Sequence, residues 1–236
     1  MIKVIAAIRR RPGMTHQEYV KYITEVHGAI AAKNKMTVRK YVQNHVVDAA
    51  FGATGDPAHL NVLPRDSVTE LWFDDMAGLA LCFSDPYTRE EIGPDGVHFS
   101  DLPTAISLLV HEGEPHGQES APGMAKAMWF LKARENVEPE QFLAQWAEAD
   151  VRAADASGLA RRVSEPALVV DEAGGGAGYF GGHDMIRYDG LQTLWLEPGD
   201  PVAAIRGYEE LFLKNQTEWL DSSRSFWLIA TEHRIF

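Results

Sequence analysis

The residue best suited to chemistry in this sequence is His27, near the end of a predicted helix. It lies four residues after Ile23 and one after Val26, in a segment whose apolar residues Tyr19, Ile23, Val26 and Ile30 recur at three- and four-residue intervals. We therefore expect these apolar residues and His27 to lie on the face that the helix turns toward a sheet. A partly buried imidazole titrates near neutral pH and can act as general base or general acid without a cofactor. His27 is therefore the candidate proton-transfer residue; the alternative is a core histidine bonded to a backbone carbonyl.

A second set of polar side chains lies on a predicted strand at residues 38–47. Alternation along this strand places Tyr41, Gln43 and His45 on one face. If that face borders a pocket under the helix, Tyr41 and Gln43 could bind a substrate carbonyl or hydroxyl, and His45 could supply a second proton-transfer group. The alternative is a solvated face or an interface of the sheet.

Two further residues are candidates for substrate binding. His98 follows the sequence GPDG in an irregular segment that could fold over the pocket. Trp72 lies on a predicted strand, and Trp195 occupies the corresponding place later in the chain. Aromatic residues repeated in this way more often pack a core or an interface than stack on a substrate.

The remaining motifs favour neither a metal nor a cofactor. The nine histidines are scattered, and no metal-ligand spacing such as H-E-x-x-H occurs. The glycine-rich segment at 174–182 lacks the Walker lysine and does not open a helix, so we expect a flexible connection or a lid there. Cys82 has no histidine partner and is predicted to be a small buried hydrophobe.

The elements that must position these residues occur twice. Lys3 corresponds to Lys126, an offset of 123 residues (126 minus 3), and the same offset carries Ile23 onto Trp146. It also carries Leu71-Trp72 onto Leu194-Trp195. A shared offset over such a distance indicates an internal repeat.

Helix-start signals fall at equivalent places in the two copies. Thr15 and Glu18 form a capping box, and Pro139 opens the corresponding helix in the second copy. The remaining predicted elements are strands at 38–47, 66–73 and 104–111 with a helix at 75–83, then strands at 161–170, 186–196 and 225–235 with a helix at 201–213. Each copy is therefore predicted to run β-α-β-β-α-β. The polar stretch EGEPHGQESAPG separates them, so we expect units at 1–113 and 124–236.

At the level of residues, the first half resembles the EthD family. The resemblance is carried by Tyr19, Tyr22, the sequence EVHG at 25–28, the strand RKYVQNHV at 39–46 and FSD at 99–101. It implies an α+β fold in which two ferredoxin-like βαββαβ units form a pseudo-dimeric α+β barrel within one chain. It also adds Tyr22 to the candidate binding residues. Relatives include cofactor-free isomerases, polyketide cyclases, dehydratases and monooxygenases, several of which use a histidine at the end of the first helix.

The second half resembles a diverged copy of the first. Asp150 takes the place of His27, and a carboxylate with an ordinary pKa of about 3.9 is a poor replacement for a proton shuttle at neutral pH. We therefore expect one working pocket, in the first half, with the second filled by Trp129, Phe130 and Trp146. The alternative is two open pockets with a different catalytic role for Asp150.

Composition limits the classes of protein. The formal charge is −12, and no basic block compensates for it, so we expect no nucleic-acid partner. A single cysteine excludes an internal disulfide, and the basic residues near the N-terminus follow the apolar stretch instead of preceding it, which is the reverse of a secretory signal. These features predict a cytoplasmic protein that does not span a membrane.

These patterns lead to a functional hypothesis. We expect a cofactor-independent lyase or dehydratase, isomerase or cyclase that acts on a small apolar metabolite, aromatic or lactone-like, by histidine acid/base catalysis. The alternatives are a non-catalytic small-molecule-binding or accessory protein and, third, a cofactor-free monooxygenase or a haem-binding relative. The expected partner is a small-molecule substrate, and the chain is expected to be a monomer (a pseudo-dimer) or a homodimer.

Overall fold

The first half of the chain forms one βαββαβ unit in the computed structural model, which describes residues 1–52, 59, 63–119, 121–168, 180, 182, 185–214 and 218–236. Its elements are β1 (Ile2–Ile8), α1 (His16–Tyr22), the π-helical turn η1 (Ile23–His27), α2 (Gly28–Lys33), β2 (Lys40–Phe51), β3 (Ser67–Phe73), α3 (Met76–Ser84), the short helical turns η2 (Thr88–Ile92), α4 (Gly93–Asp95), η3 (Gly96–His98) and η4 (Leu102–Thr104), and β4 (Ile106–His111). The predicted capping box is present, with Thr15 accepting from the Glu18 backbone and the Glu18 side chain accepting from Thr15.

The second half repeats the same order. Its elements are β6 (Ala125–Leu131), α5 (Pro139–Ala153), β7 (Leu159–Pro166), β8 (Gly190–Leu196), α6 (Pro201–Leu213) and β9 (Phe226–Arg234), and the short strand β5 (His116–Gly117) between the halves pairs with β7. Pro139 is the first residue of α5, as its fixed φ favours. The strand predicted at 161–170 ends at Pro166, and residues 169–170 lie outside the described part of the chain.

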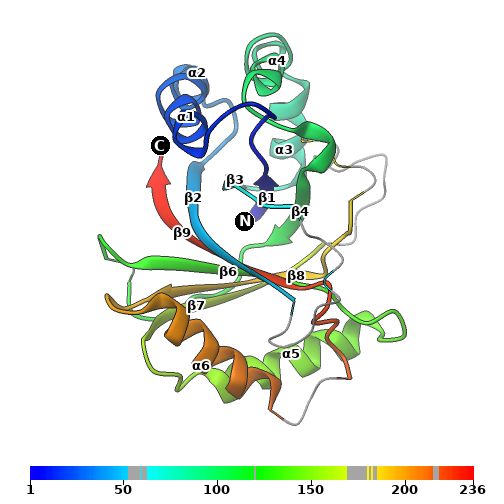
Figure 1. Ribbon diagram of the computed structural model, residues 1–236. Coiled ribbons are helices and arrows are strands. Elements are labelled where there is room, and N and C mark those ends of the chain that lie inside the picture. The colour runs from blue at the N-terminus through cyan, green and yellow to red at the C-terminus, as the bar shows by residue number, and fades with distance from the viewer. Residues whose placement is uncertain are drawn as a thin grey trace.

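The strands form a curled antiparallel sheet in the order β4-β1-β3-β2-β9-β6-β8-β7-β5. The halves are joined where β2 pairs with β9, from Val42 opposite Arg234 to Phe51 opposite Phe226. The sheet closes where β4 meets the segment that follows β7. There Val110 forms a β-bridge with Ala167, and the Leu168 amide donates to the Leu109 carbonyl at 2.7 Å. The two units therefore form one barrel within one chain, as predicted (Figure 1).

The barrel separates an interior core from two outer layers. Inward residues such as Ile5, Met128 and Leu228 fill its apolar part. Helices α1, α2 and α3 cover the outer face of the first half, and α5 and α6 cover that of the second half on the opposite side (Figure 1). No helix among the described residues is long and apolar enough to cross a lipid bilayer.

One end of the barrel interior holds a buried ion network that joins the halves. Lys3 pairs with Glu70 at 2.7 Å and with Glu165 at 2.5 Å, and Lys126 pairs with Glu70 and, at 3.1 Å, with Glu232. Burial alone would raise the pKa of Glu70, but the two ammonium groups outweigh it and hold that pKa far below its ordinary value. Glu70 is therefore an ionised group that both halves share.

The repeat is visible in the aromatic residues beside this network. The Trp72 ring lies between Lys3, at 4.8 Å from its centroid, and Lys40, at 4.4 Å. The equivalent Trp195 ring lies beside Lys126 at 4.9 Å and Arg161 at 5.1 Å. Both tryptophans therefore make cation–π contacts in the barrel interior.

Replacing Glu70 should cost much of the stability of the chain. In Glu70→Ala, Lys3 and Lys126 would lose their shared buried partner, and breaking a buried ion pair typically costs about 3–5 kcal/mol. Urea denaturation measures the change in the free energy of unfolding. Asp74→Ala is the matched control because Asp74 pairs with Arg39 on the surface, where its side chain is 53% exposed. An equal loss in the two variants would contradict the role given to the network.

Candidate active site

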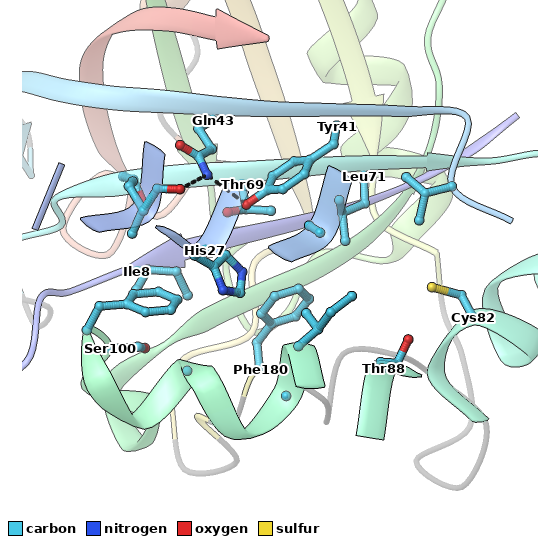
Figure 2. A pocket seen from close by; sticks show the side chains of 18 of the residues that line it. Ile8, His27, Tyr41, Gln43, Thr69, Leu71, Cys82, Thr88, Ser100 and Phe180 are labelled. Atoms are coloured by element: carbon cyan, nitrogen blue, oxygen red, sulfur yellow. Dashed lines mark hydrogen bonds between the residues drawn. The ribbon is translucent and has the colours of Figure 1, made fainter. Parts of the chain in front are cut away.

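A cavity of about 130 Å³ lies between the outer face of the first-half sheet and its helical cover. Its walls are mainly apolar, and the polar side chains at its surface include His27, Tyr41, Gln43 and Thr69 (Figure 2). Cys82 also lines it and is buried, as predicted; burial raises the pKa of its thiol, so it stays protonated at neutral pH.

The π-helical turn sets the position of His27. The Gly28 amide donates to the Ile23 carbonyl, five residues back, so the helix here is wider than an α-helix. A Cβ at position 28 would meet Ile235 Cδ1 at 2.9 Å and Ile23 O at 3.1 Å, which explains the glycine. The turn moves Val26 outward to 40% exposure, contrary to the predicted inward stripe. Such turns are frequent at functional sites.

His27 is held by a carboxylate that the sequence patterns did not single out. Its Nδ1 lies 2.8 Å from Asp95 Oδ2, and the Tyr22 hydroxyl donates to Asp95 Oδ1 at 2.6 Å. Burial alone would raise the pKa of Asp95, but the hydrogen bonds from His27 and Tyr22 outweigh it and lower that pKa. Burial and the Asp95 contact raise the pKa of Tyr22 to about 12, so Tyr22 remains a donor.

This contact defines which His27 nitrogen is available. An ionised carboxylate only accepts, so Nδ1 carries a hydrogen and Nε2 is the nitrogen that can exchange a proton with a ligand. Phe99 packs against the imidazole with ring centroids 4.7 Å apart. Asp95 and Phe99 come from the segment over the cavity that was predicted to be irregular, and the local signals there were GPDG at 93–96 and FSD at 99–101.

Gln43 orients Tyr41 and ties the strand to the helix. Its Nε2 donates to the Ile23 carbonyl at 2.8 Å and to the Tyr41 hydroxyl oxygen at 2.9 Å (Figure 2). Burial raises the pKa of Tyr41 to about 12 although the Gln43 bond opposes it. Tyr41 therefore keeps its proton as a possible donor to a ligand, and Gln43 is a positioning residue.

The structure does not bring all the predicted site residues together. His27, Tyr41 and Gln43 line the cavity, whereas Tyr22 does not line it and is joined to His27 through Asp95. Trp72 does not, because alternation on β3 sends Thr69 and Leu71 to the cavity and turns Trp72 into the barrel. His98 is exposed although its segment covers the cavity.

His45 also lies outside the residues that line the cavity. It stacks on His233 with ring centroids 5.4 Å apart, and its Nε2 is 3.3 Å from Gln43 Oε1. Burial, with the neighbouring His233, lowers the pKa of His45 to about 4. His45 therefore lies where β2 pairs with β9, and its ring is neutral at physiological pH.

The His45 environment predicts a pH-dependent stability. Because the pKa of His45 in the folded chain is below its ordinary value of 6.5, the unfolded chain binds the proton first as pH falls. The stabilisation is present above 6.5 and is lost as pH falls toward 4. Urea denaturation at about pH 7.5 and about pH 5 should show a smaller loss in His45→Gln than in the unaltered chain. His98→Gln, an exposed control, should not reduce the loss; equal losses in all three proteins would contradict the assignment.

The equivalent space in the second half is filled. Trp146, the counterpart of Ile23, is 2% exposed and packs in one apolar cluster with Trp129 and Trp227. Its ring lies over Gly190, where a Cβ would meet the indole at 2.3 Å. The expectation for Trp129 and Trp146 is confirmed, whereas that for Phe130 is wrong. Alternation on β6 turns Phe130 into the barrel interior.

Asp150 has structural partners in place of a cavity. The Tyr208 hydroxyl donates to Asp150 Oδ1 at 2.6 Å, and Arg162 Nε donates to Oδ2 at 3.0 Å. Both carboxylate oxygens are therefore hydrogen-bonded to groups of the second half.

Asp150→Ala should lower stability and spare activity. The substitution leaves the buried Tyr208 hydroxyl without its acceptor, which costs about 1–3 kcal/mol. Urea denaturation should show this loss, whereas turnover at the His27 cavity should be retained. Loss of turnover in a variant with a native circular dichroism spectrum would instead assign a catalytic role to Asp150.

Solved structures similar to this chain share its fold over nearly the whole length. An anthrone oxidase-like protein is 8% identical with a TM-score of 0.59, covering 99% of this chain and 93% of that one. A candidate monooxygenase from Fusobacterium nucleatum is 6% identical with a TM-score of 0.58, at 98% and 93% coverage. A chlorite dismutase variant from Candidatus Nitrospira defluvii is 7% identical with a TM-score of 0.54, at 98% and 91% coverage. The chain thus has the fold known as the dimeric α+β barrel.

The family comparison gives a match that covers most of the first half. Residues 11–103 match the EthD domain, a range that contains His27, Asp95 and the strand with Tyr41. This match agrees with the resemblance of the first half to the EthD family. No curated protein sequence matches the chain significantly.

Proposed function

We propose that this chain is an enzyme that moves a proton on a small, largely apolar metabolite, with His27 as general base and general acid. One observation carries the proposal: His27 lines an apolar cavity, and its Nδ1 lies 2.8 Å from Asp95 Oδ2. A carboxylate on one imidazole nitrogen fixes the ring and stabilises the imidazolium that forms when the other nitrogen takes a proton.

The polar groups support a reaction beside a carbonyl or hydroxyl. His27 Nε2 takes a proton from a carbon next to a carbonyl, and the Tyr41 hydroxyl stabilises the negative charge that develops on the oxygen. His27 then returns the proton to another carbon, which completes an isomerisation, or to a departing hydroxyl, which leaves as water. The same enolate attacking a second carbonyl would give a cyclisation. These steps correspond to an isomerase, a dehydratase or a cyclase and need no electron carrier.

Proton abstraction can be tested before the natural substrate is known. Phenylacetone, a one-ring ketone with an acidic benzylic carbon, is incubated in deuterium oxide, and NMR follows deuterium incorporation. The unaltered chain should accelerate exchange, and His27→Ala should slow the catalysed rate by about 10²-fold or more, as expected for the loss of a general base. His98→Ala is the matched control because His98 is exposed outside the cavity, and it should exchange at the unaltered rate.

Asp95→Asn tests the positioning partner in the same assay. It should lower the catalysed rate while leaving phenylacetone binding nearly unchanged, because Asp95 contacts His27 and Tyr22 and not the ligand. Equal exchange by the unaltered chain and His27→Ala would remove His27 from the mechanism. Binding of phenylacetone without any acceleration would favour the non-catalytic binding role.

A second candidate function is oxygenation without a cofactor. Its support comes from the similar structures described as an anthrone oxidase-like protein and a monooxygenase. The same deprotonation would give a carbanion that reduces O₂: one oxygen atom ends in a new carbonyl of the oxidised substrate and the other leaves as water. Oxygen uptake in step with product formation would distinguish this reaction from isomerisation or dehydration, which consume no O₂.

A further inference from the structure

Two aromatic walls of the His27 cavity come from the second half of the chain. Phe180 lies between β7 and β8, and Phe236 follows β9, yet both line the cavity under the first-half helices. The EthD match ends at residue 103. The cavity is therefore incomplete without residues outside that domain.

Phe236 is fixed beside the candidate catalytic groups. The Tyr41 amide donates to the Phe236 carbonyl at 3.2 Å, and the Ile235 amide donates to the Tyr41 carbonyl at 2.9 Å, so the β2–β9 pairing continues beyond the strand. The Phe236 ring meets Tyr41 edge-on at 5.9 Å, and Lys35 lies 4.6 Å from its centroid. The ring is thus in contact with both Tyr41 and Lys35.

Phe180 forms another part of the cavity wall. It meets Phe83 edge-on at 6.3 Å and packs against both apolar clusters that border the cavity. Nearby, Gly182 has a φ of +71°, and a Cβ there would meet the Ala105 carbonyl oxygen at 1.8 Å. This close approach ties the second-half backbone to the first half, and Figure 2 shows the Phe180 side chain among the residues that line the cavity.

The volume left between these walls limits the ligand. The cavity measures about 130 Å³, whereas an apolar cavity of about 150 Å³ accepts one benzene molecule. A ligand with two fused rings would require one of the two phenylalanines to move. We infer that Phe236 and Phe180 are specificity-determining residues, through which the second half restricts the site to one-ring ligands. This inference rests on the His27 cavity being the functional site of the proposed enzyme.

Binding of two probes tests the size limit without turnover. Phenol and 2-naphthol share a hydroxyl and differ by one ring, and calorimetry gives the Kd of each. The larger apolar area would favour 2-naphthol in an unrestricted site, but the unaltered chain should bind phenol more tightly. In Phe236→Ala and in Phe180→Ala, 2-naphthol should gain affinity relative to phenol. The Kd of phenol divided by the Kd of 2-naphthol should therefore rise by about tenfold or more.

Ile235→Ala is the matched control, because Ile235 neighbours Phe236 but does not line the cavity; it should keep the preference for phenol. If Phe236→Ala lacks a native circular dichroism spectrum, Phe236→Leu keeps more of the apolar side chain and should shift the ratio in the same direction. A preference of the unaltered chain for 2-naphthol, no binding of either probe, or an unchanged ratio in the phenylalanine variants would overturn the inference. Because these are binding measurements, failure of the His27 mechanism alone would leave their expected result unchanged.

Discussion

The pairing of β2 with β9 is the interaction on which the barrel and the cavity both depend. It joins the two halves from Val42 opposite Arg234 to Phe51 opposite Phe226. It also brings Phe236 beside Tyr41, whose neighbour Gln43 is bonded to the π-helical turn that carries His27. One strand pairing therefore links the fold of the whole chain to the geometry of one site.

The structure also shows how two similar halves have become unlike. Lys3 and Lys126 are equivalent, but the position of Glu70 is taken in the second half by Thr193, so one carboxylate serves both lysines. On the outer faces, Ile23 is replaced by Trp146, and Ser67 by Gly190, which makes room for the indole. A symmetric dimer could not separate these roles, because each substitution would appear in both copies. Within one chain, one half keeps a cavity and the other packs solidly.

Much of the fold could be predicted because its signals are local. The capping box at Thr15, the proline that opens α5 and the alternation along β2 depend on neighbours in the sequence. The site could be predicted only in part. His27 and Tyr41 lie on regular elements, whereas Asp95 reaches His27 from 68 residues away, through turns that lack a periodic pattern.

The errors have physical causes of the same kind. Val26 was predicted to face inward because a regular helix was assumed, and the π-helical turn changes that phase. Trp72 was a candidate for substrate binding beside the alternative of core or interface packing, and its position on β3 turns it into the barrel. Phe180 and Phe236 were missed because their contribution depends on the packing of one half against the other, which no local pattern describes.

The central claim is that the chain has one ligand site, in the first half, walled by the second. A crystal structure of the chain soaked with phenol tests it most directly. The account predicts electron density for one phenol ring between His27, Tyr41 and Phe236, with the cluster around Trp146 unchanged. Phenol bound instead under α5 and α6, or only in the charged end of the barrel near Glu70, would contradict it.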